Sequence, residues 1–71
     1  TEIRFDLKQS GYTKLTVFDL LGRQVGTLVN ENLTAGKHAV RYDASRIAAG
    51  VYFYRIESGN FQQTRKMVLV K

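Results

Sequence analysis

The chain contains no cysteine, no proline and no tryptophan, and it has a single histidine. Without cysteine, neither a disulfide nor a thiolate-bound metal can support the core. No apolar run approaches the roughly 20 residues that a helix needs to cross a bilayer. The first residues, Thr1–Phe5, alternate like a strand and do not have the composition of a secretory leader. We therefore expect the chain to be a piece of a longer protein.

The length of 71 residues is enough for one domain, and we assign residues 1–71 to a single one. A domain of this size buries only about 60% of the surface that its unfolded chain exposes, so its stability is modest. It has no room for a second lobe or for the deep cleft in which most active sites lie. The length therefore disfavours an enzyme.

The net charge of +5 is unevenly distributed along the chain. Basic and acidic residues balance in residues 1–35, whereas residues 36–71 carry seven lysines and arginines against two carboxylates. This asymmetry indicates either an anionic partner for the second half of the chain or simply a well-solvated face.

Apolar and polar residues alternate with a period of two along most of the chain, which is typical of half-buried strands. The strands expected from this pattern cover residues 3–7, 12–19, 23–30, 37–42, 51–57 and 61–70. Turns or loops are expected at residues 9–11, 20–23, 31–36 and 58–60, with Gly22 supplying a positive φ. Six or seven short antiparallel strands without a long helix predict an all-β fold, either a sandwich or a small barrel.

The segment Asp43–Gly50 breaks the alternation, and we expect one helical turn there, capped by Asp43 and ended by Gly50. In the strand that follows, Tyr52, Tyr54 and Ile56 are expected to face the core, because the intervening Arg55 must point outward.

For the last strand the pattern leaves two choices open, either Met67 with Leu69 inward or Val68 with Val70 inward. The end of the chain is apolar and strand-forming, so we expect it to be held in the sheet, although most chain termini fray.

No set of side chains forms a recognisable catalytic or metal-binding constellation. His38 is a lone histidine in a strand, where a residue at the rim of a sheet is the simpler interpretation. Asp19 and Asp43 could share a calcium ion through loop oxygens, but the chain lacks the dense carboxylates of a calcium loop. We therefore assign no catalytic residue, no metal ligand and no cofactor.

Nucleic-acid binding is an alternative that the last hairpin raises. Aromatic side chains that could stack on bases lie near cations that could contact phosphates. The residues concerned are Tyr52, Phe53, Tyr54, Phe61, Arg55, Arg65 and Lys66. Aromatic residues are also ordinary in the core of a small sheet, and we favour that interpretation.

Several short motifs follow one another in a fixed order along the whole chain. They are Thr1–Phe5, Leu15–Val25, Leu33–His38, Tyr42–Asp43, Gly50–Arg55 and Lys66–Lys71. This ordered set resembles the type A C-terminal sorting domain of the type IX secretion system. The family differs from this chain in two places, because its first strand commonly ends in leucine-proline where Leu7-Lys8 stands here, and its tryptophan-aspartate is Tyr42-Asp43 here.

The resemblance implies a small Ig-like antiparallel β-sandwich at the C-terminus of an exported protein in Bacteroidota. Such a domain directs an N-terminal passenger from the periplasm through the outer membrane to the cell surface or the medium. The partners implied are a secretion-machinery protein of the outer membrane and a sortase-like peptidase. Neither a cofactor nor a nucleic acid is implied.

Carried over by position, the family's glycine-x-tyrosine motif falls on Gly50 and Tyr52, and its aspartate-x-x-glycine turn falls on Asp19 and Gly22. Gly36 and Asp43 are expected at further turns. The family's terminal lysine-bearing segment falls on Lys66, Met67, Val68, Leu69, Val70 and Lys71.

We expect the secretion machinery to recognise the final hairpin, with Lys66 and Lys71 as charged contacts. A free strand edge can add to a receptor sheet, and a basic end can steer it toward an acidic surface. The alternative is a structural assembly module similar to the Ig-like domain of flagellar hook-capping proteins. An accessory carbohydrate-binding module would need exposed aromatics on one flat face.

Overall fold

The computed structural model describes residues 2–43, 45 and 47–70. Six strands lie within this part of the chain, and none of its residues belongs to a helix that is long and apolar enough to cross a membrane. The strands are β1 (Glu2–Leu7), β2 (Gly11–Phe18), β3 (Gln24–Leu33), β4 (Gly36–Arg41), β5 (Gly50–Ser58) and β6 (Phe61–Leu69).

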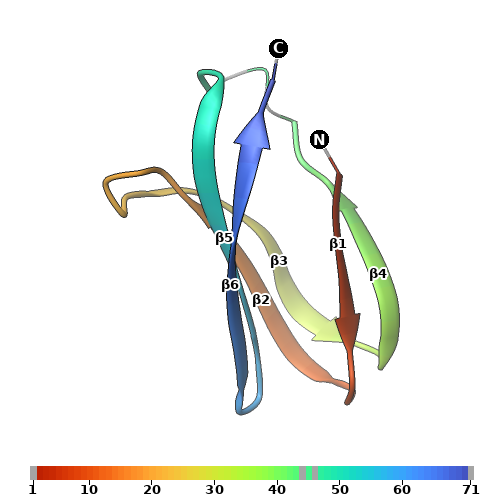
Figure 1. The fold of residues 1–71 in the computed structure, drawn as a ribbon. Coiled ribbons are helices and arrows are strands. Elements are labelled where there is room, and N and C mark those ends of the chain that lie inside the picture. Colours follow the sequence, from red (N-terminus) through yellow and green to blue (C-terminus); the bar gives the residue numbers. More distant parts are fainter. Residues whose placement is uncertain (1, 44, 46, 71) are drawn as a thin grey trace.

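The strands form two antiparallel sheets, one of four strands in the order β3-β2-β5-β6 and one of two strands, β1-β4 (Figure 1). The chain passes from the large sheet to the small one between β3 and β4. This arrangement confirms the predicted all-β antiparallel sandwich. The start of β1 and the end of β6 lie at the same end of the molecule (Figure 1).

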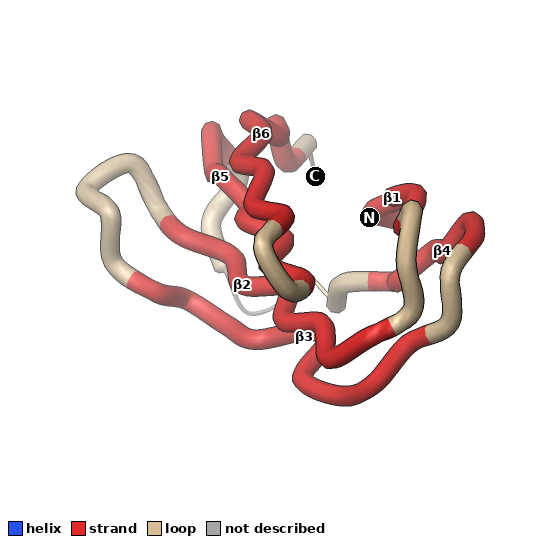
Figure 2. Tube along the Cα trace, turned by 90° about the horizontal axis from the view of Figure 1, so that it is seen from below, coloured by secondary structure: helices blue, strands red, loops and turns tan. Residues whose placement is uncertain are grey.

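Among the described residues, no strand pairing joins the two sheets, and β1 and β6 are edge strands that face each other on one side of the molecule (Figure 2). A hollow of about 560 Å³ lies between the sheets on that side. The small sheet has half as many strands as the large one, so part of the large sheet's inner face stays uncovered.

The core forms where the inner faces of the two sheets meet. Leu15 and Val17 of β2 are completely buried, which follows from the position of β2 between two other strands. The remaining buried apolar residues come from both sheets and are Ile3, Leu7, Tyr52, Ile56 and Leu69. Thr13 is equally buried, and its hydroxyl lies 3.2 Å from both the Gly11 carbonyl oxygen and Ser58 Oγ, which satisfies its polar group.

The prediction that residues 31–36 form a loop is wrong. β3 continues to Leu33, because Glu31, Asn32 and Leu33 pair with the start of β2 and so complete the hydrogen bonds of both strands. Only Thr34 and Ala35 connect β3 with β4. The hydroxyl of Ser10 accepts a hydrogen bond of 2.9 Å from the Ala35 amide. The polar residues in this part of the sequence did not indicate where the pairing of β3 with β2 ends.

The alternation of inward and outward side chains is irregular along β3. The pairing of β2 with β3 shifts between Leu15 and Thr16 and again between Val17 and Phe18. These irregularities interrupt the alternation of side chains, so that both Leu28 and Val29 pack against the core.

The segment between β4 and β5 begins with a side-chain cap. The amide of Ser45 donates a hydrogen bond of 3.0 Å to Asp43 Oδ1, which is the capping role predicted for Asp43. Ser45 itself has 3₁₀ conformation. The rest of the predicted helical turn includes residues 44 and 46, which lie outside the described residues. Burial against the core raises the pKa of the neighbouring Tyr42 above its ordinary value.

Candidate recognition surface at the C-terminal hairpin

The β5–β6 hairpin begins at a glycine whose conformation other residues rarely adopt. Gly50 has a φ of 147°, within the range that glycine tolerates best. Two residues later, the Tyr52 hydroxyl donates a hydrogen bond of 2.7 Å to the carbonyl oxygen of Ala48. Tyr52 is only 8% exposed. The glycine-x-tyrosine pair therefore sets the path of the chain into β5 and ties that strand to the preceding loop.

The tip of the hairpin fixes the register of the two strands. Ser58 pairs with Phe61, and the two residues between them form the turn, with Gly59 at a φ of 57°. A two-residue hairpin with glycine first matches the twist of the flanking strands. This register resolves the choice left open by the sequence, because it places Met67 opposite Tyr52 and Leu69 opposite Gly50.

The terminal segment is divided between two faces of the sheet. Leu69 is 2% exposed and Met67 packs against the core, so these residues anchor the strand. Val68, by contrast, is 57% exposed, and Lys66 is also exposed. Alternation along the strand puts Lys66 and Val68 on the outer face. Just past β6, Val70 is 88% exposed. Lys71, the other predicted charged contact, lies outside the described residues.

The outer face of the large sheet next to Lys66 combines aromatic rings with cations. Phe53 is the cross-strand partner of both Lys66 and Phe18. The guanidinium of Arg55 lies 4.8 Å from the centre of the Phe18 ring, a cation–π contact. Val51 is the partner of Val68. Lys66 thus projects from the edge of a partly apolar outer face.

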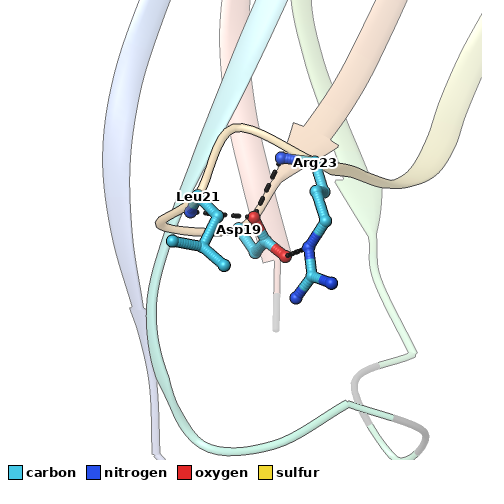
Figure 3. Close-up of polar contacts among 3 residues, drawn as sticks. All are labelled: Asp19, Leu21 and Arg23. Atoms are coloured by element: carbon cyan, nitrogen blue, oxygen red, sulfur yellow. Dashed lines mark hydrogen bonds and ion pairs between the residues drawn. The ribbon is translucent and has the colours of Figure 1, made fainter.

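The turn between β2 and β3 is held by a single carboxylate (Figure 3). Asp19 Oδ1 accepts hydrogen bonds of 2.9 Å from the amides of Leu21 and Arg23, and Oδ2 accepts one of 2.9 Å from Arg23 Nε. The Arg23 amide, more than any other group, lowers the pKa of Asp19. Gly22 has the predicted positive φ, at 83°. Asp19 and Gly22 therefore act as turn residues, and both carboxylate oxygens serve the turn.

The remaining predicted turn and rim residues also have structural partners. Gly36 opens β4 with a φ of 123°. The ring of His38 stacks on Phe5 with centroids 5.4 Å apart, and its Nε2 lies 2.7 Å from the Thr34 carbonyl oxygen. Within the described residues, no group of three histidine, aspartate or glutamate side chains could hold a metal ion.

The aromatic residues behind the nucleic-acid alternative do not share one surface. Tyr52 and Tyr54 face the core, whereas Phe53 lies on the opposite face of the same strand. Arg65 and Lys66 are divided in the same way. Stacking of successive bases needs aromatics and cations along one groove. The hairpin has no such row among these residues.

The sequence did not single out one exposed apolar pair beside the hairpin. Leu20 and Leu21 are 66% and 79% exposed at the tip of the β2–β3 turn. They border a shallow hollow that also includes Gly50 and Tyr52. Two consecutive leucines in a turn were the available signal, since turns are usually built from polar residues and glycine.

The geometry defines a small antiparallel sandwich whose final strand is an edge strand with an exposed outer face. A family described as secretion system C-terminal sorting domain matches residues 1–71, the whole chain. The chain belongs to this family, whose members are C-terminal sorting signals for type IX secretion. The family implies export through that secretion system toward the cell surface and an interaction with its machinery. Comparison with curated proteins and with solved structures gave no match.

Proposed function

We propose that the secretion machinery recognises this domain through its last hairpin, β5–β6, and through Lys66 and Val68 in particular. The observation that carries the proposal is the division of the strand into two sets of residues. Met67 and Leu69 hold β6 on the core, and their neighbours Lys66 and Val68 stand exposed on the outer face. A folded domain therefore presents a fixed pattern of cation and apolar side chain at its edge.

The free edge of β6 supports the same proposal. β6 ends the four-stranded sheet, so one side of its backbone has no neighbouring strand there. A receptor strand can pair with such an edge, and the side chains beside it supply specificity. The net charge of +5 favours approach to an acidic receptor surface. Gly50 and Tyr52 act indirectly, since they set the position of β5 on which β6 is built.

In the full proposal the chain forms the C-terminal part of a longer exported protein. The passenger precedes residue 1, crosses the periplasm and reaches the outer membrane folded. A sortase-like peptidase then removes the domain. Lys71 is a second charged contact in this proposal. The domain itself has no catalytic role in this proposal. Its role is to be recognised by the secretion machinery, so that the attached passenger is exported.

The test is an export assay. Residues 1–71 with the native upstream linker are fused to a periplasmic reporter in a host that has type IX secretion, and reporter in the medium or on the surface is measured. Lys66→Glu together with Lys71→Glu is expected to abolish most export. Lys14→Glu is the matched control, because Lys14 is an exposed lysine on β2 in the same sheet, away from the terminal edge.

Loss of export in the Lys66 and Lys71 variant with retention in the Lys14 variant supports local recognition. Equal export of all three proteins removes the proposal. Equal loss in both variants contradicts recognition at the terminal edge. Circular dichroism of the purified domains confirms that each variant is folded. A structural assembly module would instead leave the reporter in the periplasm even with the unchanged domain.

A further inference from the structure

The open side of the sandwich carries a groove on the inner face of β6, opposite the exposed side chains of the proposed recognition surface. It lies between the two sheets, has a volume of about 560 Å³ and is bordered by β1, β4, β5 and β6. Phe5 and His38 of the small sheet and Tyr54 of the large sheet line its interior. It faces away from Lys66 and Val68, which lie on the outer face of β6. Sequence reasoning missed it, because its residues come from four separate strands.

The charged residues around the groove are mostly cations. Arg4, Lys37 and Arg65 line it, against a single carboxylate, Asp6. Arg4 is engaged by Glu2, since its Nε lies 2.6 Å from Glu2 Oε1. Among the described residues, Lys37 and Arg65 have no ion-pair partner. The groove therefore keeps a net positive charge.

Arg65 is held in position at the groove by its neighbour. In the amide orientation that satisfies both side chains, the Gln63 oxygen accepts hydrogen bonds from Nη2 and Nε of Arg65 at 2.8 and 3.0 Å. A guanidinium that is oriented in advance loses less conformational entropy when it binds a carboxylate. One edge of its fork remains available for such a partner.

The backbone of β6 adds a second requirement for the ligand. Counting from the closing pair Ser58–Phe61, alternate residues of an antiparallel ladder turn their N–H and C=O groups away from the partner strand. In β6 these residues are Gln62, Thr64, Lys66 and Val68. Their backbone groups lie along the open side, next to the groove. A chain with regularly spaced donors and acceptors can pair with them.

We propose that this groove binds an extended acidic peptide segment of another protein, which adds to β6 as a fifth strand of the large sheet. Glutamate or aspartate side chains at alternate positions then face the groove and reach Arg65 and Lys37, and the side chains between them point to the outer face of the sheet. A second copy of this chain is a poorer occupant, because two domains of net charge +5 repel each other. A nucleic acid supplies the charge but cannot complete the strand ladder.

The probe for the test is a fluorescein-labelled ten-residue peptide that alternates glutamate and valine, titrated with the 71-residue chain at low salt. Fluorescence anisotropy is expected to rise to saturation, and the affinity is expected to fall with added salt. Arg65→Glu is expected to weaken binding about fivefold, since reversing one exposed charge changes the free energy of binding by about 1 kcal/mol. Hydrogen exchange at the amides of Gln62, Thr64 and Lys66 is expected to slow in the complex.

Lys14→Glu is the matched variant, because it makes the same change of charge at an exposed lysine on β2 of the same sheet, away from the open edge. It is expected to leave peptide affinity within about twofold. The groove proposal rests on the proposed function in one respect, because both use the free edge of β6. Arg65→Glu changes the groove and leaves Lys66 and Val68 of the outer face intact, so absence of peptide binding together with loss of export in the Lys66 and Lys71 variant overturns the groove proposal alone.

Four results would overturn the groove proposal. The first is equal binding of a peptide with proline at every third position, which cannot form a strand ladder. The second is equal or tighter binding of a single-stranded oligonucleotide of the same charge. The third is a stable dimer of the unliganded chain by light scattering, which would show that a second copy occupies the open edge. Absence of saturable binding up to about 1 mM peptide likewise excludes it.

Discussion

β2 and β6 belong to the same sheet and have nearly the same length, yet they contribute differently to the molecule. β2 lies between β3 and β5, and three of its residues, Thr13, Leu15 and Val17, are completely buried. β6 lies at the edge, and Leu69 is its only fully buried residue. Position in the sheet thus separates a strand that stabilises the fold from a strand that other proteins can reach.

The largest effect expected from this comparison is on stability. Leu15→Ala removes a completely buried side chain and is expected to lower the free energy of unfolding by about 2–5 kcal/mol. A domain of this size has only about 4–11 kcal/mol in total. Val68→Ala is the control on β6 and is expected to cost less than about 0.5 kcal/mol, because Val68 is 57% exposed. Urea denaturation measures both, and equal losses would contradict the division between the strands.

A smaller effect is expected at the start of the hairpin. Gly50→Ala places a side chain at a φ of 147° and is expected to cost about 1–2 kcal/mol, although no atom lies within 4 Å of the added methyl group. Gly26→Ala is the matched control in β3, where the methyl group would meet only the Tyr42 side chain, with the hydroxyl oxygen at 3.6 Å and ring atom Cε1 at 3.9 Å, both ordinary contacts. That variant is expected to remain within about 0.5 kcal/mol of the parent. Thermal unfolding of both variants distinguishes backbone strain from crowding, and an equal loss in both would argue against strain.

The smallest effect concerns pH and the turn at the end of β2. Hydrogen bonds, chiefly from the Arg23 amide, hold the pKa of Asp19 below its ordinary value of 3.8. A lowered native pKa means that this contribution to stability is present above pH 3.8 and is lost as the pH falls through the native pKa. The difference in Tm between the parent and Asp19→Asn is therefore expected to be larger at pH 6 than at pH 2.5. A difference that stays constant over this range would rule out the carboxylate charge as the cause.

The sequence predicted the features that depend on local chemistry. Glycine at Gly22 and Gly50, the capping carboxylate of Asp43 and a turn around Gly59 all follow from backbone preferences that neighbours hardly change. The inward side chains of β5 followed from the placement of Arg55.

Features that depend on long-range pairing could not be predicted. The face of β6 depended on the hairpin register, and a shift of one residue would have exchanged Met67 and Val68. The end of β3 depended on pairing with β2, which lies more than ten residues earlier in the chain. The groove forms because the fold brings Phe5, Tyr54 and Arg65 together from three different strands. A local sequence pattern contains no information about such a long-range contact.

The chain enters β1 and leaves β6 at the same end of the molecule (Figure 1). A passenger attached ahead of Glu2 would therefore lie at the end of the molecule where β6 ends, near Val70, and not at the opposite end. A large passenger on a short linker would cover the free edge of β6, whereas a longer linker would allow the passenger to move away from that edge. If the proposed function holds, the length of the linker between the passenger and Glu2 is therefore expected to affect how easily a receptor reaches β6.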